Sequence, residues 1–121
     1  SDEKPPKIIN FTTRASVNAS QNVRLFCETE GKPPLAFKWF RNGRLIGSCK
    51  GDLERKRTCF LHRQQGKYNV LWRGSGTELV IKKAFHPFDT GVFTCVAMNS
   101  VGTDNKTVTL DIHGRSLIKA M

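Results

Sequence analysis

The sequence lacks a long apolar segment: none of its apolar runs approaches the roughly 20 residues that cross a bilayer. Residues 1–6 are charged and lack the hydrophobic core of a secretory signal. We therefore expect any membrane anchor to lie outside this sequence. No segment sustains a helical apolar stripe, which argues against a parallel sheet with crossover helices and thus against a nucleotide-binding fold.

Residue groups that perform catalysis are also missing. His62, His86 and His113 have no nucleophile at a plausible spacing, and no glycine-rich phosphate loop follows a strand. The sequence thus predicts a non-enzyme without a cofactor. Zinc binding by Cys49 and Cys59 with His62 and His86 is an alternative, but their spacing matches no standard ligand pattern. We expect no metal site.

What the chain does contain points to a single extracellular domain. Its 121 residues suit one domain, and four cysteines form the even set that a disulfide framework requires. Three Asn-x-Ser/Thr triplets mark possible N-glycosylation sites at Asn10, Asn18 and Asn105. One triplet arises easily by chance, but three beside an even cysteine set favour a secreted protein or the ectodomain of a membrane protein.

Apolar and polar residues alternate in short segments between turn signals, as in half-buried strands. The Asn42-Gly43 pair predicts a tight turn, because both residues accept a positive φ at low cost. Many short strands without helices predict an all-β, two-sheet antiparallel sandwich. We expect strands at residues 7–11, 23–28, 36–41, 44–46, 68–73, 77–81, 92–98 and 103–112.

A set of landmark residues identifies the kind of sandwich. They are Cys27, Trp39, the run Leu79-Val-Ile-Lys-Lys-Ala84, the motif Asp89-x-Gly91-x-Phe93-x-Cys95, and Ala97-x-Asn99-x-x-Gly102. With them the chain resembles the intermediate set of the immunoglobulin superfamily, from Pro5 to Ile112. The resemblance implies a Cys27–Cys95 disulfide between the sheets, with Trp39, Leu79 and Phe93 in the core. The family usually has tyrosine at the position of Phe93, so we expect its hydroxyl-mediated corner bond to be absent.

The segment between Trp39 and Leu79 is longer than this family requires. The surplus is an insert at about residues 47–67, between the expected strands 44–46 and 68–73, and it holds the other two cysteines. With Cys27 and Cys95 paired, Cys49 and Cys59 remain to pair with each other, and closing so short a loop contributes about 3 kcal/mol. We therefore expect an N-terminal extension over 1–6, an immunoglobulin-like domain over 7–113 with a disulfide-closed insert, and a linker or tail over 114–121.

Positive charge is concentrated around this insert. Residues 38–73 carry ten basic and two acidic side chains, a net of +8 out of a total of +10. Such a density attracts polyanions, and outside the cell these include heparan sulfate. Nucleic acid is not expected, because no recognition helix or stacking platform is present. Alternatively, the basic loop only keeps the domain soluble. The proposed polyanion-binding residues are Lys38, Arg41, Arg44, Lys50, Arg55, Lys56, Arg57, Arg63, Lys67 and Arg73.

A protein-binding face is a second possibility. If Trp39 points inward, then Phe40 points outward, and the same alternation places Val96 and Met98 outward on a neighbouring strand. Aromatic and methionine side chains are enriched in interface cores, so these three residues predict a site for a homophilic or heterophilic protein partner. The alternative is that they are ordinary scattered surface residues.

Two groups within the family are especially similar. Pro5-Pro6-Lys7-Ile8 and Gly31-Lys-Pro-Pro-Leu35 resemble neuronal adhesion molecules of the Down syndrome cell adhesion type, which implies a cell-surface adhesion or receptor protein. Phe37-Lys-Trp-Phe-Arg-Asn-Gly43 and Glu78-Leu-x-Ile-x-Lys-Ala84 are similar to the neuregulin immunoglobulin-like domain, which implies that the domain anchors a signalling module to the matrix. A passive spacer domain is the third alternative.

Overall fold

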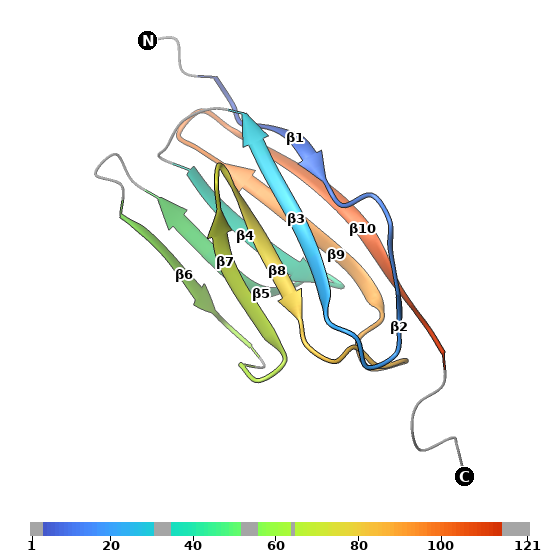
Figure 1. Ribbon diagram of the computed structural model, residues 1–121. Helices are drawn as coiled ribbons and strands as arrows, with labels where there is room; N and C mark the ends of the chain where they lie inside the picture. Colours follow the sequence, from blue (N-terminus) through green and yellow to red (C-terminus); the bar gives the residue numbers. More distant parts are fainter. Residues whose placement is uncertain (1–3, 31–34, 52–55, 64, 115–121) are drawn as a thin grey trace.

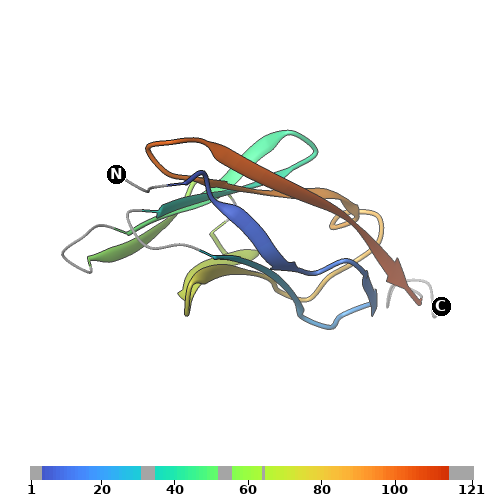
Figure 2. The ribbon, with the colours of Figure 1, turned by 90° about the horizontal axis from the view of Figure 1, so that it is seen from above.

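Ten β-strands in two sheets make up the computed structural model, which describes residues 4–30, 35–51, 56–63 and 65–114. The four-stranded sheet contains, in order, β1 (Lys7–Phe11), β3 (Val23–Glu30), β8 (Gly76–Ile81) and β7 (Tyr68–Arg73). The six-stranded sheet contains, in order, β2 (Ala15–Asn18), β10 (Thr103–His113), β9 (Gly91–Met98), β4 (Leu35–Arg41), β5 (Arg44–Gly51) and β6 (Arg57–Leu61). The two sheets pack face to face (Figures 1 and 2). The expected all-β immunoglobulin sandwich is confirmed, and no helix in the described ranges could cross a membrane.

Alternating side chains form the core between the sheets. In β3, Val23, Leu25 and Cys27 are buried, whereas Arg24 and Phe26 lie on the outer face. The strand period of two puts every second residue on the same face, so one apolar series per strand fills the space between the sheets.

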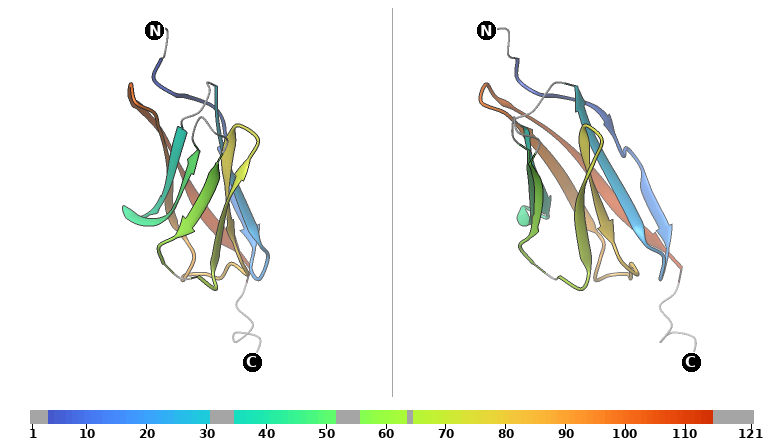
Figure 3. Two further views of the ribbon diagram at one scale, coloured as in Figure 1. Left: turned by 90° about the vertical axis from the view of Figure 1, so that its left-hand side faces the viewer. Right: turned by 60° about the vertical axis from the view of Figure 1, so that its left-hand side comes forward.

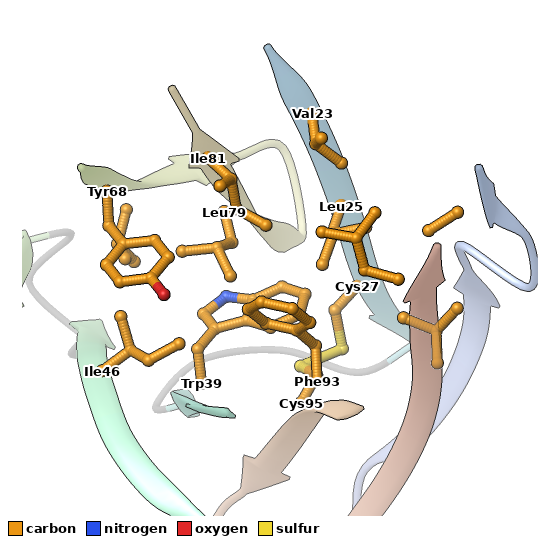
Figure 4. Packing of buried hydrophobic residues seen from close by; sticks show 14 of the residues in the cluster. Val23, Leu25, Cys27, Trp39, Ile46, Tyr68, Leu79, Ile81, Phe93 and Cys95 are labelled. Carbon is orange, nitrogen blue, oxygen red and sulfur yellow. A yellow bond between two sulfur atoms is a disulfide. The ribbon is translucent and has the colours of Figure 1, made fainter. Parts of the chain in front are cut away.

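Trp39 lies at the centre of this core (Figure 4). Its indole Nε1 donates a hydrogen bond to the Thr77 hydroxyl across the sandwich, at 3.2 Å. The Cys27–Cys95 disulfide joins β3 to β9 beside it, as expected. Constraining a loop of 68 residues in the unfolded chain stabilises the fold by about 4 kcal/mol in the chain-entropy account.

Phe93 is fully buried, and other side chains hold the corner that precedes β9. Arg41 donates hydrogen bonds from Nη2 to the carbonyl oxygens of Phe88, at 2.6 Å, and Thr90, at 2.7 Å. Buried Asp89 accepts the Phe85 N–H at 2.8 Å. A cation from β4 and a carboxylate within the corner therefore fix its backbone.

Two strands of the structure were not expected from the sequence. The first is β2, which pairs in parallel with β10. At four residues it offers too short an alternation to recognise, with only Ala15 buried. The second is β6, which pairs with β5 and turns much of the expected insert into an extension of the six-stranded sheet.

Two glycines in β5, Gly47 and Gly51, allow neighbouring strands to pack closely against it. A Cβ atom at Gly47 would lie 2.8 Å from the Val70 side chain and 2.9 Å from the Phe60 carbonyl oxygen. At Gly51 it would lie 3.1 Å from the Trp72 ring. Glycine inside a strand often marks such a close approach, so β5 continues to Gly51 instead of ending at residue 46.

Candidate functional site

The hairpin formed by β5 and β6 is the most distinctive part of the surface. Cys49 lies directly opposite Cys59 and is joined to it by the second expected disulfide, with a Cα–Cα distance of 4.0 Å. Cys49 is fully buried, so the hairpin is anchored in the core. β6 is the outermost strand of its sheet, and Figure 3 views the molecule from this edge. The hairpin is therefore a rigid platform at one side of the sandwich.

Most of the expected polyanion-binding residues lie on or beside this hairpin. Arg44 and Lys50 are exposed on β5, and half-buried Lys38 lies on the adjacent strand β4. Lys56, Arg57 and Arg63 are exposed on or next to β6. Arg55 lies outside the described residues. We call the remaining six the hairpin cations: Lys38, Arg44, Lys50, Lys56, Arg57 and Arg63.

The other three expected residues lie off the two hairpin strands and have partners of their own. Arg41 holds the corner before β9, as described above. Lys67 forms an ion pair with buried Asp89 at 2.9 Å. Arg73 lies on the four-stranded sheet, where it pairs with buried Glu78 at 3.5 Å and stacks over Phe26. The structure thus divides the nine described residues among the hairpin, the corner before β9 and the four-stranded sheet.

The two strands of the hairpin carry basic side chains and no acidic ones. Neither Arg44–Gly51 nor Arg57–Leu61 contains an acidic residue. The Arg57 guanidinium lies 5.1 Å from the Trp72 ring centroid and donates to the Gly74 carbonyl oxygen at 2.9 Å, which fixes its position without cancelling its charge. Positive charge is therefore concentrated on these two strands.

An apolar residue that the sequence analysis missed is exposed on the same platform. Phe60 in β6 is 57% exposed. The strand register places it opposite Ser48, which lies opposite Lys38, which in turn lies opposite Val96. These residues form one row across the outer face of the six-stranded sheet. Had β6 been recognised as a strand, its neighbour Cys59 would have placed Phe60 on the opposite, outer face.

The predicted apolar stripe lies on the same outer face. Phe40, Val96 and Met98 are each half-buried. The register pairs Phe40 with Thr94 and Val96 with Lys38, so polar residues separate the apolar ones. The three residues therefore share a face without forming a continuous apolar surface.

A hollow of about 430 Å³ lies at one end of the hairpin. Its lining residues are Arg41, Arg44, Ile46, His62, Arg63 and Tyr68. Burial raises the pKa of the Tyr68 phenol, and Asp89 raises it further, while the neighbouring Arg41 guanidinium opposes the shift. The hydroxyl therefore stays protonated well into the alkaline range.

The glycosylation triplets lie on β1, β2 and β10, and the one on β10 is only two strands from Lys38, because Asn105 lies opposite Val96 and Val96 opposite Lys38. Asn10 is on β1, Asn18 on β2 and Asn105 on β10, and all three are exposed. Each asparagine is thus accessible to modification. Occupancy of these sites stays a prediction.

The cysteines do not support the zinc alternative. Cys49 and Cys59 form a disulfide, so neither offers a thiolate to a metal. Within the described ranges, no three or more His, Cys, Asp or Glu side chains are grouped so that they could hold a metal ion.

Comparisons with known proteins agree with this architecture. Human hemicentin-1 is 30% identical over 118 residues, and protein sidekick-2 of Gallus gallus is 30% identical over 113 residues. These matches cover 98% and 93% of this chain, which spans only 2% and 4% of the respective relatives. The titin M4 domain superimposes with a TM-score of 0.73 at 21% identity, covering 93% of this chain and 100% of that domain. A family model described as the immunoglobulin I-set domain matches residues 6–112, so the chain belongs to the immunoglobulin I-set family.

Proposed function

We propose that this domain is an extracellular recognition module that binds a sulfated glycosaminoglycan, such as heparan sulfate, through the β5–β6 hairpin. The observation that carries the proposal is the placement of the hairpin cations on and beside two strands, β5 and β6, that contain no acidic residue. Two disulfides suit an oxidising compartment, where such polyanions occur. Immunoglobulin-like domains typically serve as binding modules, which agrees with this role.

The rigidity of the hairpin supports binding in a second way. A flexible basic loop loses conformational entropy when it binds, whereas a disulfide-closed, sheet-paired hairpin has already lost it. The Arg57 guanidinium is likewise held on Trp72 before any ligand arrives. Affinity should then come mainly from the release of cations that are condensed on the sulfate groups, as happens when proteins bind DNA phosphates. Binding should therefore weaken steeply as the salt concentration rises.

Chromatography on immobilised heparin tests this proposal. We expect the wild-type domain to stay bound at the physiological ionic strength of about 0.15 M and to elute only at higher salt. Replacing Lys50 and Lys56 with Ala should lower the eluting salt concentration markedly. The matched control replaces exposed Lys7 and Lys106, on β1 and β10, and removes the same charge far from the hairpin. Wild-type flow-through at physiological salt, or equal shifts for both pairs, would contradict the proposal.

A protein partner is the second candidate function. It is favoured by Phe60, which is 57% exposed beside the basic strands, with half-buried Phe40, Val96 and Met98 on the same outer face. Such a partner could be a second copy of this chain or another protein. We expect Phe60→Asp to abolish concentration-dependent association in sedimentation experiments, because a charge at an interface centre is strongly unfavourable. A wild-type chain that stays monomeric at all concentrations excludes the self-association form.

Three types of parent protein are compatible with this function. An adhesion or receptor ectodomain, a neuregulin-like ligand anchored to the matrix and a chain with passive spacer domains all contain such a module. Retention on heparin with loss in the hairpin variant favours the first two over the spacer, because a spacer has no ligand of its own.

A further inference from the structure

We propose that the hollow at the end of the β5–β6 hairpin binds one sulfo group of a sulfated sugar, and thereby holds a glycosaminoglycan chain in place. This inference rests on the proposed function, because the sulfo group belongs to the same polyanion that the hairpin is proposed to bind. The hairpin strands would supply general attraction, and the hollow would supply directed hydrogen bonds.

Four chain segments bring the lining residues together. Arg41 ends β4 and Arg44 begins β5, and the tight Asn42-Gly43 turn places them opposite each other. His62 and Arg63 follow β6, where the His62 N–H donates to the Ile46 carbonyl oxygen at 2.7 Å. This bond closes the end of the hairpin beside the turn, and the His62 ring contacts the Ser48 hydroxyl at 3.1 Å.

The guanidinium groups are positioned by neutral groups, which leaves their charges uncompensated. Arg41 donates to the carbonyl oxygens of Phe88 and Thr90. Arg63 donates from Nε to the Leu45 carbonyl oxygen at 3.0 Å, so its terminal amino groups remain for a ligand. Within the described residues, no ion pair includes Arg41, Arg44 or Arg63. Three positive charges around one hollow create a strong local preference for an anion.

The nearest influential carboxylate is already occupied. Asp89 acts on the Tyr68 hydroxyl, but it accepts hydrogen bonds from Lys67 and from the Phe85 N–H. Its charge is balanced by that of Lys67, so the pair adds no net charge beside the hollow. Tyr68 stays protonated at neutral pH and is able to donate a hydrogen bond.

The shape and lining of the hollow favour a sulfo group attached to a sugar. A volume of about 430 Å³ exceeds what one small anion needs and leaves room for part of a ring. Buried Ile46 and Tyr68 supply an apolar floor, while guanidinium groups bind tetrahedral oxyanions through paired N–H donors. From Arg44 to Lys50 the strand extends roughly 20 Å, so one extended polyanion could contact both.

Titration with a short heparin oligosaccharide, followed by amide NMR and calorimetry, tests this inference. We expect the amide signals of Ile46, His62 and Tyr68 to shift. Arg44→Gln with Arg63→Gln should weaken binding about ten-fold or more, as expected for two lost charge-assisted hydrogen bonds. The matched pair Lys50→Gln with Lys56→Gln removes equal charge and should weaken it less. Thermal unfolding of each variant checks that the fold is intact.

Three further arms distinguish the possible outcomes. A desulfated oligosaccharide, which keeps only carboxylates, should no longer shift the three amides; if it still does, the sulfo group is not the ligand. Sodium sulfate, compared at equal ionic strength with sodium chloride, tests whether the free ion suffices. Equal losses for the two variant pairs would overturn the inference while leaving the proposed function intact. If the wild-type protein does not bind heparin, the proposed function fails. Titration with an aryl sulfate would then decide whether the hollow binds a sulfo group, because binding there should still shift the amide signals of Ile46, His62 and Tyr68.

Discussion

The sandwich is closed differently at its two edges. At the edge formed by β1, β2 and β10, backbone hydrogen bonds and short side chains connect the sheets. At the edge formed by β5, β6 and β7, long side chains connect them. At the first edge, the Ile8 N–H donates to Asp104 and the Ala19 N–H donates to the His113 carbonyl oxygen. At the second, the Trp72 indole donates to the Thr58 carbonyl oxygen, and Arg57 stacks on the Trp72 ring. A disulfide completes that attachment.

The charges at the two edges differ in the same way. Lys106 on β10 has acidic neighbours along the strand in Asp104 and Asp111. On β5 and β6 the basic residues have none. The first edge thus combines basic with acidic side chains, whereas the strands of the second carry basic side chains alone.

The largest expected effect comes from removing the hairpin disulfide. Cys49→Ala with Cys59→Ala should lower the free energy of unfolding by about 3 kcal/mol, because the unfolded chain regains the freedom of the closed loop. Amides of β6 should lose hydrogen-exchange protection before those of β9, and the salt needed to elute from heparin should fall. Chemical denaturation and exchange measured by mass spectrometry check these results.

A change at the other edge provides the matched reference. Asp104→Ala removes the acceptor of the Ile8 N–H, a bond of 2.8 Å, and should cost about 1 kcal/mol. It should expose β1 amides and leave heparin elution unchanged. Equal protection of β6 and β9 in the disulfide variant would show that strand pairing alone holds the hairpin, and would remove the contrast between the edges.

The smallest expected effect concerns glycans at the sequon-bearing edge. When the domain is made in a eukaryotic secretory system, we expect glycans on Asn10, Asn18 and Asn105, detected as a mass loss after enzymatic deglycosylation. Because Asn10 and Asn18 lie away from β5 and β6, removal of their glycans should leave heparin elution essentially unchanged. Asn105 lies two strands from Lys38, so removal of its glycan should have the largest effect of the three.

A glycan introduced on the hairpin sharpens this test. Lys56→Asn creates a new triplet with Arg57 and Thr58, and its glycan should block heparin binding. Lys56→Asn combined with Thr58→Ala has the same charge but no triplet, so it should retain most binding. If natural glycans hinder binding as strongly as the introduced one, the two edges do not differ in function.

Much of the fold could be predicted because its signals are local. Alternation in Val23–Glu30 and Gly91–Met98 places Cys27 and Cys95 inward, and the Asn42-Gly43 turn sets the β4–β5 hairpin. The strand β6 could not be predicted, because its five residues have no strong alternation and its stability comes from the strand beside it. The close packing at Gly47 could not be predicted for a related reason, because the atoms that approach it belong to Phe60 and Val70, which are distant in sequence.

The sequence by itself determined the immunoglobulin-like sandwich, both disulfide pairings and the concentration of charge between residues 38 and 73. Only the tertiary structure decided how that charge is used. Arg41, Lys67 and Arg73 are committed to the Phe88 and Thr90 carbonyls, to Asp89 and to Glu78. Charge density along a chain is a local property, whereas the partner of each cation depends on which distant strands the fold places beside it. For that reason the hollow beside Arg44, His62 and Arg63 emerged only from the packed structure.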